Sequence, residues 1–183
     1  RASSIACRRT AAVRSDSGVI PSRSRARSAR MRTAPRLVCP LARESAEALF
    51  AAAQRLNLRL LAGKVMMDRN GPEGVHLSNP EDDYQDSREL IEKWHGKGRL
   101  AYAITPRFAP ACSERDLQAA GRLLKEHPGL HVQTHLCENH HEIAWVRELF
   151  PQRKSYLDVY EHYGLLGERT LLGHSLHLGD EDF

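Results

Sequence analysis

The chain has 183 residues, of which 41% are hydrophobic, and its mean hydropathy of −0.52 is typical of a soluble globular protein. No apolar run approaches the roughly 18–20 residues that a membrane-spanning helix needs, so we expect no membrane partner. The four cysteines are scattered and form no CxxC pair. This favours free thiols in a reducing compartment, the cytoplasm, over a disulfide framework or a cysteine zinc site.

The net charge of +4 is unevenly distributed along the chain. Residues 1–43 hold eleven arginines and one acid, Asp16, a net +10, whereas the remaining residues hold 16 basic and 22 acidic side chains, a net −6. A nucleic-acid-binding domain carries its basic patch on the folded surface. The distribution therefore argues against a nucleic-acid partner for the folded part.

Residues 1–43 differ from the rest of the chain in composition as well as in charge. They are rich in arginine, serine and alanine and lack a sustained apolar period, so we expect a disordered segment. Three interpretations remain open: a transit peptide, a nucleic-acid-binding arm, or a non-native extension such as one from a shifted reading frame. The first residue, Arg1 in place of Met, favours the extension.

From Glu44 onward, helix-like and strand-like segments alternate. Apolar residues at helical spacing predict a helix over residues 45–57, with Ser45 as its N-cap. Residues 58–68 follow as a buried strand, and residues 38–41 are a weaker candidate for the end of one further strand. An amphipathic helix is predicted for residues 80–98, where Gly96 and Gly98 close it.

The alternation continues to the end of the chain. We expect a strand over residues 99–108, broken by Pro106, and a helix over residues 113–129 with Ser113 as its N-cap. The remaining segments are a strand, a helix that begins near Asn139, a further helix and a last strand, at residues 130–136, 139–150, 155–166 and 169–178.

This order of elements predicts an α/β fold of parallel strands joined by crossover helices. No GxGxxG follows a strand, which argues against a dinucleotide-binding fold. Polar residues instead follow several strands, where a (β/α)₈ TIM barrel builds its site. A complete barrel takes about 250 residues, so residues 44–183 are expected to form a partial barrel domain of four to five parallel β/α units.

The pattern most suggestive of chemistry lies at the end of the strand predicted for residues 130–136. His135 is near the end of this strand and Glu138 follows three residues later. A histidine there can bind zinc, and a nearby carboxylate can exchange protons with a metal-bound water. The zincin motif HExxH is excluded because Trp145 stands where its second histidine would be. The alternative is a polar strand end with Glu138 as a first-turn acid favoured by the helix dipole.

His174 strengthens the metal interpretation. It lies in the strand that follows one β/α unit later, 39 residues after His135. In a barrel the two histidines would be neighbours at one rim, where two imidazoles can bind one divalent metal. His177 is interpreted as an outer or loop residue, and His140 and His141 are expected to face solvent.

Arg107 and Phe108 follow Pro106 at another strand end. A guanidinium can donate paired hydrogen bonds to a carbonyl-bearing ring edge, and a phenyl ring can stack on a flat heterocycle. The alternative is a surface arginine that closes a strand. Asp68 and Arg69, at a further strand end, are expected to pair with each other.

A family resemblance brings these residues together. The segments GKVMMDRN, AITPRFAP, THLCEN and GHSLHL resemble guanine deaminases of the amidohydrolase superfamily, and the resemblance runs from about residue 44 to residue 183. It implies zinc-dependent hydrolytic deamination of guanine to xanthine and ammonia, as in purine catabolism. Full-length members of such a family are expected to be homo-oligomers.

The resemblance also implies a role for each candidate residue. His135 and His174 would be two of the metal ligands. Glu138 would move a proton from the metal-bound water to the ring and help the amine to leave. Arg107 would bind the carbonyl edge of the purine, with Phe108 beside the ring.

The sequence departs from the family pattern in its ligand set. The HxH pair that ends the first barrel strand of the family is absent, and the late metal-binding aspartate would lie beyond Phe183. Two of five ligands therefore remain, fewer than the three or four protein ligands usual for zinc. We expect a central fragment of a guanine deaminase that is inactive as it stands. Two alternatives stay open: a related amidohydrolase that acts on another amino-substituted heterocycle, and a non-catalytic binding module.

Overall fold

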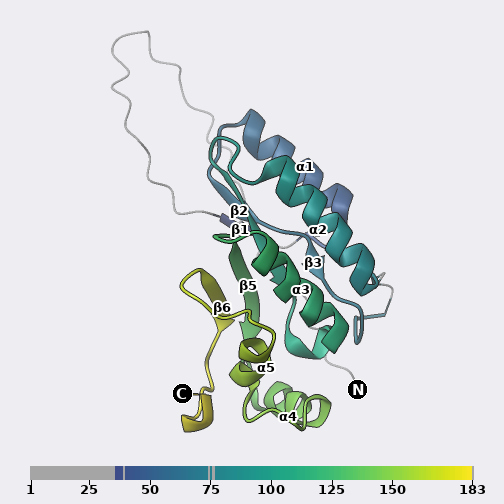
Figure 1. The fold of residues 1–183 in the computed structure, drawn as a ribbon, viewed down its shortest axis with the longest axis vertical. Helices are drawn as coiled ribbons and strands as arrows, with labels where there is room; N and C mark the ends of the chain where they lie inside the picture. The colour runs from purple at the N-terminus through teal and green to yellow at the C-terminus, as the bar shows by residue number, and fades with distance from the viewer. Residues whose placement is uncertain (1–35, 39, 74, 76, 183) are drawn as a thin grey trace, which may run out of the picture. The chain divides into compact units, whose positions relative to one another are not determined.

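The computed structural model describes residues 36–38, 40–73, 75 and 77–182 (Figure 1). The disorder expected over residues 1–43 falls mostly outside these residues. The strands are β1 (Arg36–Val38), β2 (Leu60–Ala62), β3 (Val65–Met66), β4 (Leu100–Pro106), β5 (His131–Leu136) and β6 (Thr170–His174). The α-helices are α1 (Arg43–Arg55), α2 (Pro80–Trp94), α3 (Glu114–Glu126), α4 (His140–Leu149) and α5 (Tyr156–His162). Two short 3₁₀ helices, η1 (Ala109–Ala111) and η2 (Asp180–Asp182), complete the set.

All described strands run parallel, in the order β1-β2-β4-β5-β6, with β3 also paired to β4. Helices connect the strands that pair with one another, whereas β2 and β3 are joined by two residues, and this alternation is the one that the sequence pattern predicted. The expectation of a partial α/β barrel is thus confirmed. None of the described helices is long and apolar enough to span a membrane.

The sheet begins earlier in the chain than expected. Strand β1 pairs with β2 through Arg36↔Leu60, and this pairing lies on the N-terminal side of the boundary expected at residue 44. Of the weak strand signal at residues 38–41, Val38 is the last residue of β1. The three residues of β1 lie next to an arginine-rich segment, so their composition did not indicate a strand.

Two of the three predicted capping residues cap the helices for which they were predicted. Ser113 accepts a hydrogen bond from the backbone of α3, and Asn139 does so for α4. The prediction for Ser45 was wrong, because α1 begins at Arg43 after an extended Ala42 that makes no side-chain cap bond. The Arg43 guanidinium forms ion pairs with two carboxylates of α2, which ties the first turn of α1 to its neighbour.

The strand expected over residues 58–68 is divided into β2 and β3. Both pieces keep one register against β4, since Leu60 pairs with Leu100 and Val65 with Thr105, 40 positions apart in each case. A Cβ atom at Gly63 would lie 1.7 Å from the carbonyl oxygen of Ala103. The interruption therefore allows the backbone to approach β4 more closely than a side chain would permit.

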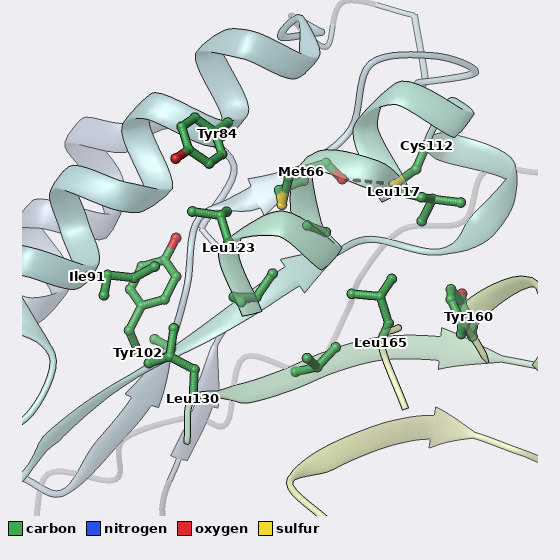
Figure 2. Packing of buried hydrophobic residues seen from close by; sticks show 14 of the residues in the cluster. Met66, Tyr84, Ile91, Tyr102, Cys112, Leu117, Leu123, Leu130, Tyr160 and Leu165 are labelled. Carbon is green, nitrogen blue, oxygen red and sulfur yellow. Dashed lines mark hydrogen bonds between the residues drawn. The ribbon is translucent and has the colours of Figure 1, made fainter. Parts of the chain in front are cut away.

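The core lies between the sheet and its helices, and α1, α2 and α3 lie side by side along one face of the strands (Figure 1). Alternate strand residues such as Tyr102, Ile104 and Val132 belong to this core together with side chains of the helices. Figure 2 shows Tyr102 beside Ile91 of α2 and Leu123 of α3. The intervening residues face away from the helices, and there the amide of Gln133 donates to Thr105 Oγ1 at 2.8 Å.

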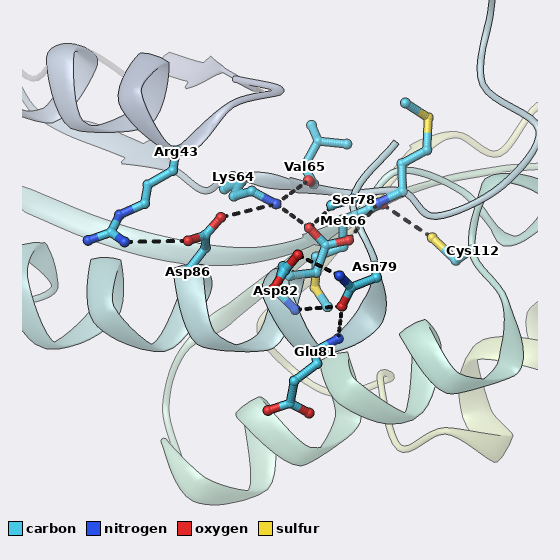
Figure 3. Close-up of polar contacts among 12 residues, drawn as sticks. Arg43, Lys64, Val65, Met66, Ser78, Asn79, Glu81, Asp82, Asp86 and Cys112 are labelled. Atoms are coloured by element: carbon cyan, nitrogen blue, oxygen red, sulfur yellow. Dashed lines mark hydrogen bonds and ion pairs between the residues drawn. The ribbon is translucent and has the colours of Figure 1, made fainter. Parts of the chain in front are cut away.

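A buried ion pair fastens the β2–β3 junction to α2 (Figure 3). The Lys64 ammonium binds the Asp83 carboxylate, and both side chains are almost fully buried. Asp83 also accepts from the backbone nitrogen of Met67 at 3.1 Å and from Ser78 Oγ at 2.6 Å. The charges of Lys64 and Asp83 neutralise each other, and further hydrogen bonds satisfy the carboxylate. These two charged side chains can therefore be buried in the core.

Candidate functional site at the carboxyl ends of three strands

The candidate residues gather at the edge of the sheet where parallel strands end together. Arg107 follows β4, His135 lies in β5 and His174 is the last residue of β6. In the β5–β6 register Leu136 pairs with His174. The imidazole centroids of the two histidines are 5.4 Å apart and their planes are inclined by 28°. The sheet thus brings together two side chains that lie 39 positions apart in sequence.

His135 is held in one orientation by the carbonyl oxygen of Arg107. Its backbone nitrogen donates to this oxygen at 3.3 Å and its ring Nδ1 lies 2.6 Å from it. A carbonyl can only accept, so Nδ1 carries the proton and the lone pair remains on Nε2. Imidazole ligands of metals commonly use this arrangement, in which the second nitrogen is fixed by a hydrogen bond.

Glu138 reaches the second histidine. Its carboxylate oxygen Oε2 lies 3.5 Å from His174 Nε2, and the side chains of the two residues are 35% and 36% exposed. The backbone turns sharply before Glu138, since Cys137 has a φ of 50°, and again at His174 with a φ of 66°. Both side chains are about one third exposed and so are open to solvent and to small molecules.

Glu142, in the first turn of α4, contacts the backbone of Glu138 through its side chain. Its side chain is only 7% exposed and its Oε1 accepts from the Glu138 backbone nitrogen at 3.4 Å. Burial raises the pKa of Glu142, and the nearby charge of Glu138 acts in the same direction. Glu142 is thus a residue of α4 whose buried carboxylate also contacts the backbone that carries Glu138.

Arg107 and Phe108 are half-buried beside this group. The Arg107 guanidinium lies 5.9 Å from the centroid of the Phe108 ring, which meets Trp145 edge-on at 6.2 Å. Within the described part of the chain, the guanidinium makes no ion pair or hydrogen bond. Its donors are thus available for a ligand.

Other strand-end residues do not join the group. Asp68 and Arg69 do not pair, which corrects the prediction: Asp68 accepts from the backbone nitrogen of Ser113 at 2.6 Å, and Arg69 donates to a carbonyl oxygen of η1 at 3.3 Å. His140 and His141 are exposed as expected. His177 is exposed as well, and its ring lies 4.2 Å from that of His140.

Sequence reasoning missed Tyr160, whose hydroxyl contacts the site from α5. It donates to the carbonyl oxygen of His135 at 2.7 Å. In the sequence, Tyr160 stands at helical spacing among apolar residues and is indistinguishable from core. The only signal was its hydroxyl, which needs a partner when buried.

The donor atoms fit zinc in type, because they include two imidazoles with a carboxylate beside them. They are too few, since residues 36–182 with their gaps contain no group of three or more histidine, cysteine or acidic side chains arranged to hold a metal ion. A zinc site normally has three or four protein ligands. His135 and His174 could thus supply part of a ligand set.

Known proteins with similar sequences indicate one enzyme family for this chain. Residues 32–183 match the model of the amidohydrolase family. A guanine deaminase of Escherichia coli is 51% identical over 140 residues, which are 76% of this chain and 32% of that protein. The chain thus spans about a third of the length of the curated relatives that it matches.

Two solved structures are similar over most of the chain. The E. coli guanine deaminase superposes with a TM-score of 0.77 at 50% identity and covers 80% of this chain and 34% of its own. A guanine deaminase from C. acetobutylicum with bound guanine in the active site has a TM-score of 0.74 at 34% identity, over 80% and 36% of the two chains.

Proposed function

The chain belongs to the amidohydrolase family, and on that premise we propose that it carries part of the active site of a zinc-dependent guanine deaminase. Members of this family are metal-dependent. The observation that carries the proposal is the convergence of His135, His174 and Glu138 at one edge of the sheet, next to an arginine with available donors. The similarity to guanine deaminases supports guanine as the substrate.

In this proposal His135 and His174 hold the zinc as two of its ligands. Bound zinc would supply an acidified water for attack on the carbon that bears the amino group. Glu138 would accept a proton from this water and return it to the ring and the departing amine. Water adds at that carbon, ammonia leaves, and xanthine is the product.

Arg107 and Phe108 bind the substrate in this proposal. The guanidinium donates to the carbonyl edge of guanine, and the phenyl ring lies beside the purine. The Phe108 ring packs against Trp145 with the two ring planes inclined by 72°. This arrangement favours a flat, carbonyl-bearing heterocycle over an aliphatic substrate.

Two further parts of the proposal concern the cellular context. Cys112 and Cys137 are buried free thiols, which supports a reducing compartment, the cytoplasm. We extend the proposal to a homo-oligomeric state for full-length family members.

The first test is zinc affinity, measured by competition with a chromophoric chelator. His135→Ala and His174→Ala should each lower the affinity of the chain for zinc by more than about tenfold. His141→Ala is the matched control, since this exposed histidine of α4 should leave the affinity unchanged. Equal zinc affinity in all four proteins would show that the ligand assignment is wrong.

The second part of the test concerns the substrate. The zinc-loaded chain should bind guanine in preference to cytosine or melamine by isothermal titration calorimetry, and Arg107→Ala should abolish that preference. Preferential binding of another amino-substituted heterocycle would favour the related-amidohydrolase alternative. We expect no xanthine from this chain alone, and turnover of guanine would contradict the view that two histidine ligands are too few.

A further inference from the structure

We infer that Tyr160 is a positioning residue that holds His135 and the segment carrying Arg107 in one fixed geometry, an inference that rests on the proposed function. Tyr160 belongs to α5, outside the sheet, and its side chain is fully buried (0% exposed; Figure 2). Its phenol oxygen nevertheless contacts the end of β5, which carries His135, and the start of η1, two residues after Arg107.

The Tyr160 hydroxyl makes three hydrogen bonds. It donates to the carbonyl oxygen of His135 at 2.7 Å, and it accepts from the backbone nitrogen of Ala109 and from Thr134 Oγ1, both at 3.0 Å. A phenol has one proton and two lone-pair positions, so these partners use its full capacity. The hydroxyl is therefore held from three directions.

These contacts close a ring of hydrogen bonds through the site. Tyr160 binds the carbonyl oxygen of His135, while the ring and backbone nitrogens of His135 both contact the carbonyl oxygen of Arg107. Two residues after Arg107, Ala109 donates back to Tyr160. Any movement of the end of β5 relative to the segment that follows β4 must stretch this ring, so the His135 imidazole and the Arg107 backbone move together.

Removal of the hydroxyl would open the ring at its buried side. The Ala109 nitrogen and the His135 oxygen would then lack their partner, and unsatisfied buried groups move to find one. The His135 ring depends on the same carbonyl of Arg107 for its tautomer. We therefore expect Tyr160→Phe to change the imidazole before it changes the fold.

The test compares Tyr160→Phe with Tyr102→Phe in the full chain. Tyr102 is the matched control because it is also 0% exposed and its hydroxyl accepts from a backbone nitrogen, that of Lys64 at 3.2 Å, away from the strand ends. Outer hydrogen-bond partners of metal ligands typically change metal affinity by about 10–100-fold. Tyr160→Phe should lower zinc affinity by about tenfold, and Tyr102→Phe should not lower it.

A second readout does not depend on the metal. In the zinc-free chain, the ¹⁵N chemical shifts of the His135 ring should report a protonated Nδ1, and Tyr160→Phe should shift them toward a mixture of tautomers. Should wild type fail to bind zinc through His135, the proposed function would fail while this measurement still tests Tyr160. Unchanged ¹⁵N shifts in Tyr160→Phe would overturn the positioning role.

Thr134→Val provides a milder variant in case Tyr160→Phe does not fold. It removes one of the three partners of the hydroxyl, together with a longer contact of 3.4 Å to the Arg107 carbonyl oxygen, and keeps the side-chain shape. A smaller change of the His135 shifts in the same direction is expected, and no change would overturn the inference. An equal loss of zinc affinity in Tyr102→Phe would also overturn it, because the effect would then be one of global stability.

Discussion

Two buried carboxylates behave differently because only one of them has partners. Asp83 binds Lys64 and the backbone nitrogen of Met67, whereas neither oxygen of Asp116 has a hydrogen-bond partner in the described part of the chain. Burial raises the pKa of Asp116 to about 8, and the negative charges of Asp83 and Asp68 act in the same direction. At neutral pH the folded chain therefore keeps the proton on this residue.

The pKa of Asp116 leads to a prediction for the pH dependence of stability. The unfolded chain loses this proton near pH 4, whereas the folded chain holds it to about pH 8. The free energy of unfolding should thus fall as the pH rises between these values, because the native state binds more protons there. Asp116→Asn should flatten this fall in urea titrations at several pH values. The exposed Glu44 is the control, and a slope changed as much by Glu44→Gln would contradict the assignment.

At the same scale, sequence reasoning identified the residues whose chemistry is visible in their type and spacing. His135, His174 and Glu138 come together as the strand-end pattern predicted, although their roles remain a proposal. Tyr160 and Glu142 could not be identified in this way. Their importance comes from contacts with the backbone of other elements, and such contacts leave no local pattern.

At the scale of elements, local capping was predictable and tertiary contacts were not. Ser113 and Asn139 bond to the backbone of their own helices, so the signal and its effect lie within a few residues. Ser45 had the same signal, but α1 starts earlier, where Arg43 reaches the acidic side chains of α2. The break between β2 and β3 likewise reflects a neighbour, since Gly63 is pressed against β4.

Gly63 therefore gives a test of the sheet. Gly63→Ala places a Cβ atom 1.7 Å from the Ala103 oxygen, so the two strands must separate. We expect a loss of about 1–3 kcal/mol or more in the free energy of unfolding, measured by urea titration. Gly167→Ala is the matched control, because its Cβ would meet nothing within 4 Å, and its effect should stay within about 1 kcal/mol. Equal stability of the two variants would refute the close-approach argument.

At the scale of the whole molecule, the sheet has two edges among the described strands, β1 and β6. An unpaired edge offers backbone groups for pairing with another chain. On β6, Leu171 is 40% exposed on the face away from the helices. The unpaired edge of β6 and the exposed Leu171 side chain together favour association between copies of the chain.

This association can be measured by size-exclusion chromatography over a range of concentrations. Wild type should elute as a mixture of oligomers, and Leu171→Lys should raise the dissociation constant of the smallest oligomer by about tenfold, since a charged edge resists pairing. Leu56→Lys is the control, because this leucine is 63% exposed after α1, away from the edge. A single sharp monomer peak for wild type would rule out the idea.

The parallel sheet also determines the order in which the site can form during folding. The described pairings join residues at least 24 positions apart, from Arg36↔Leu60 to Leu60↔Leu100 at 40. The entropy of closing such loops must be overcome before any pairing contributes, so parallel sheets fold slowly. Helices can form first, but the histidines of β5 and β6 meet only when both strands have docked. Metal affinity should therefore develop late in refolding, together with the last strand.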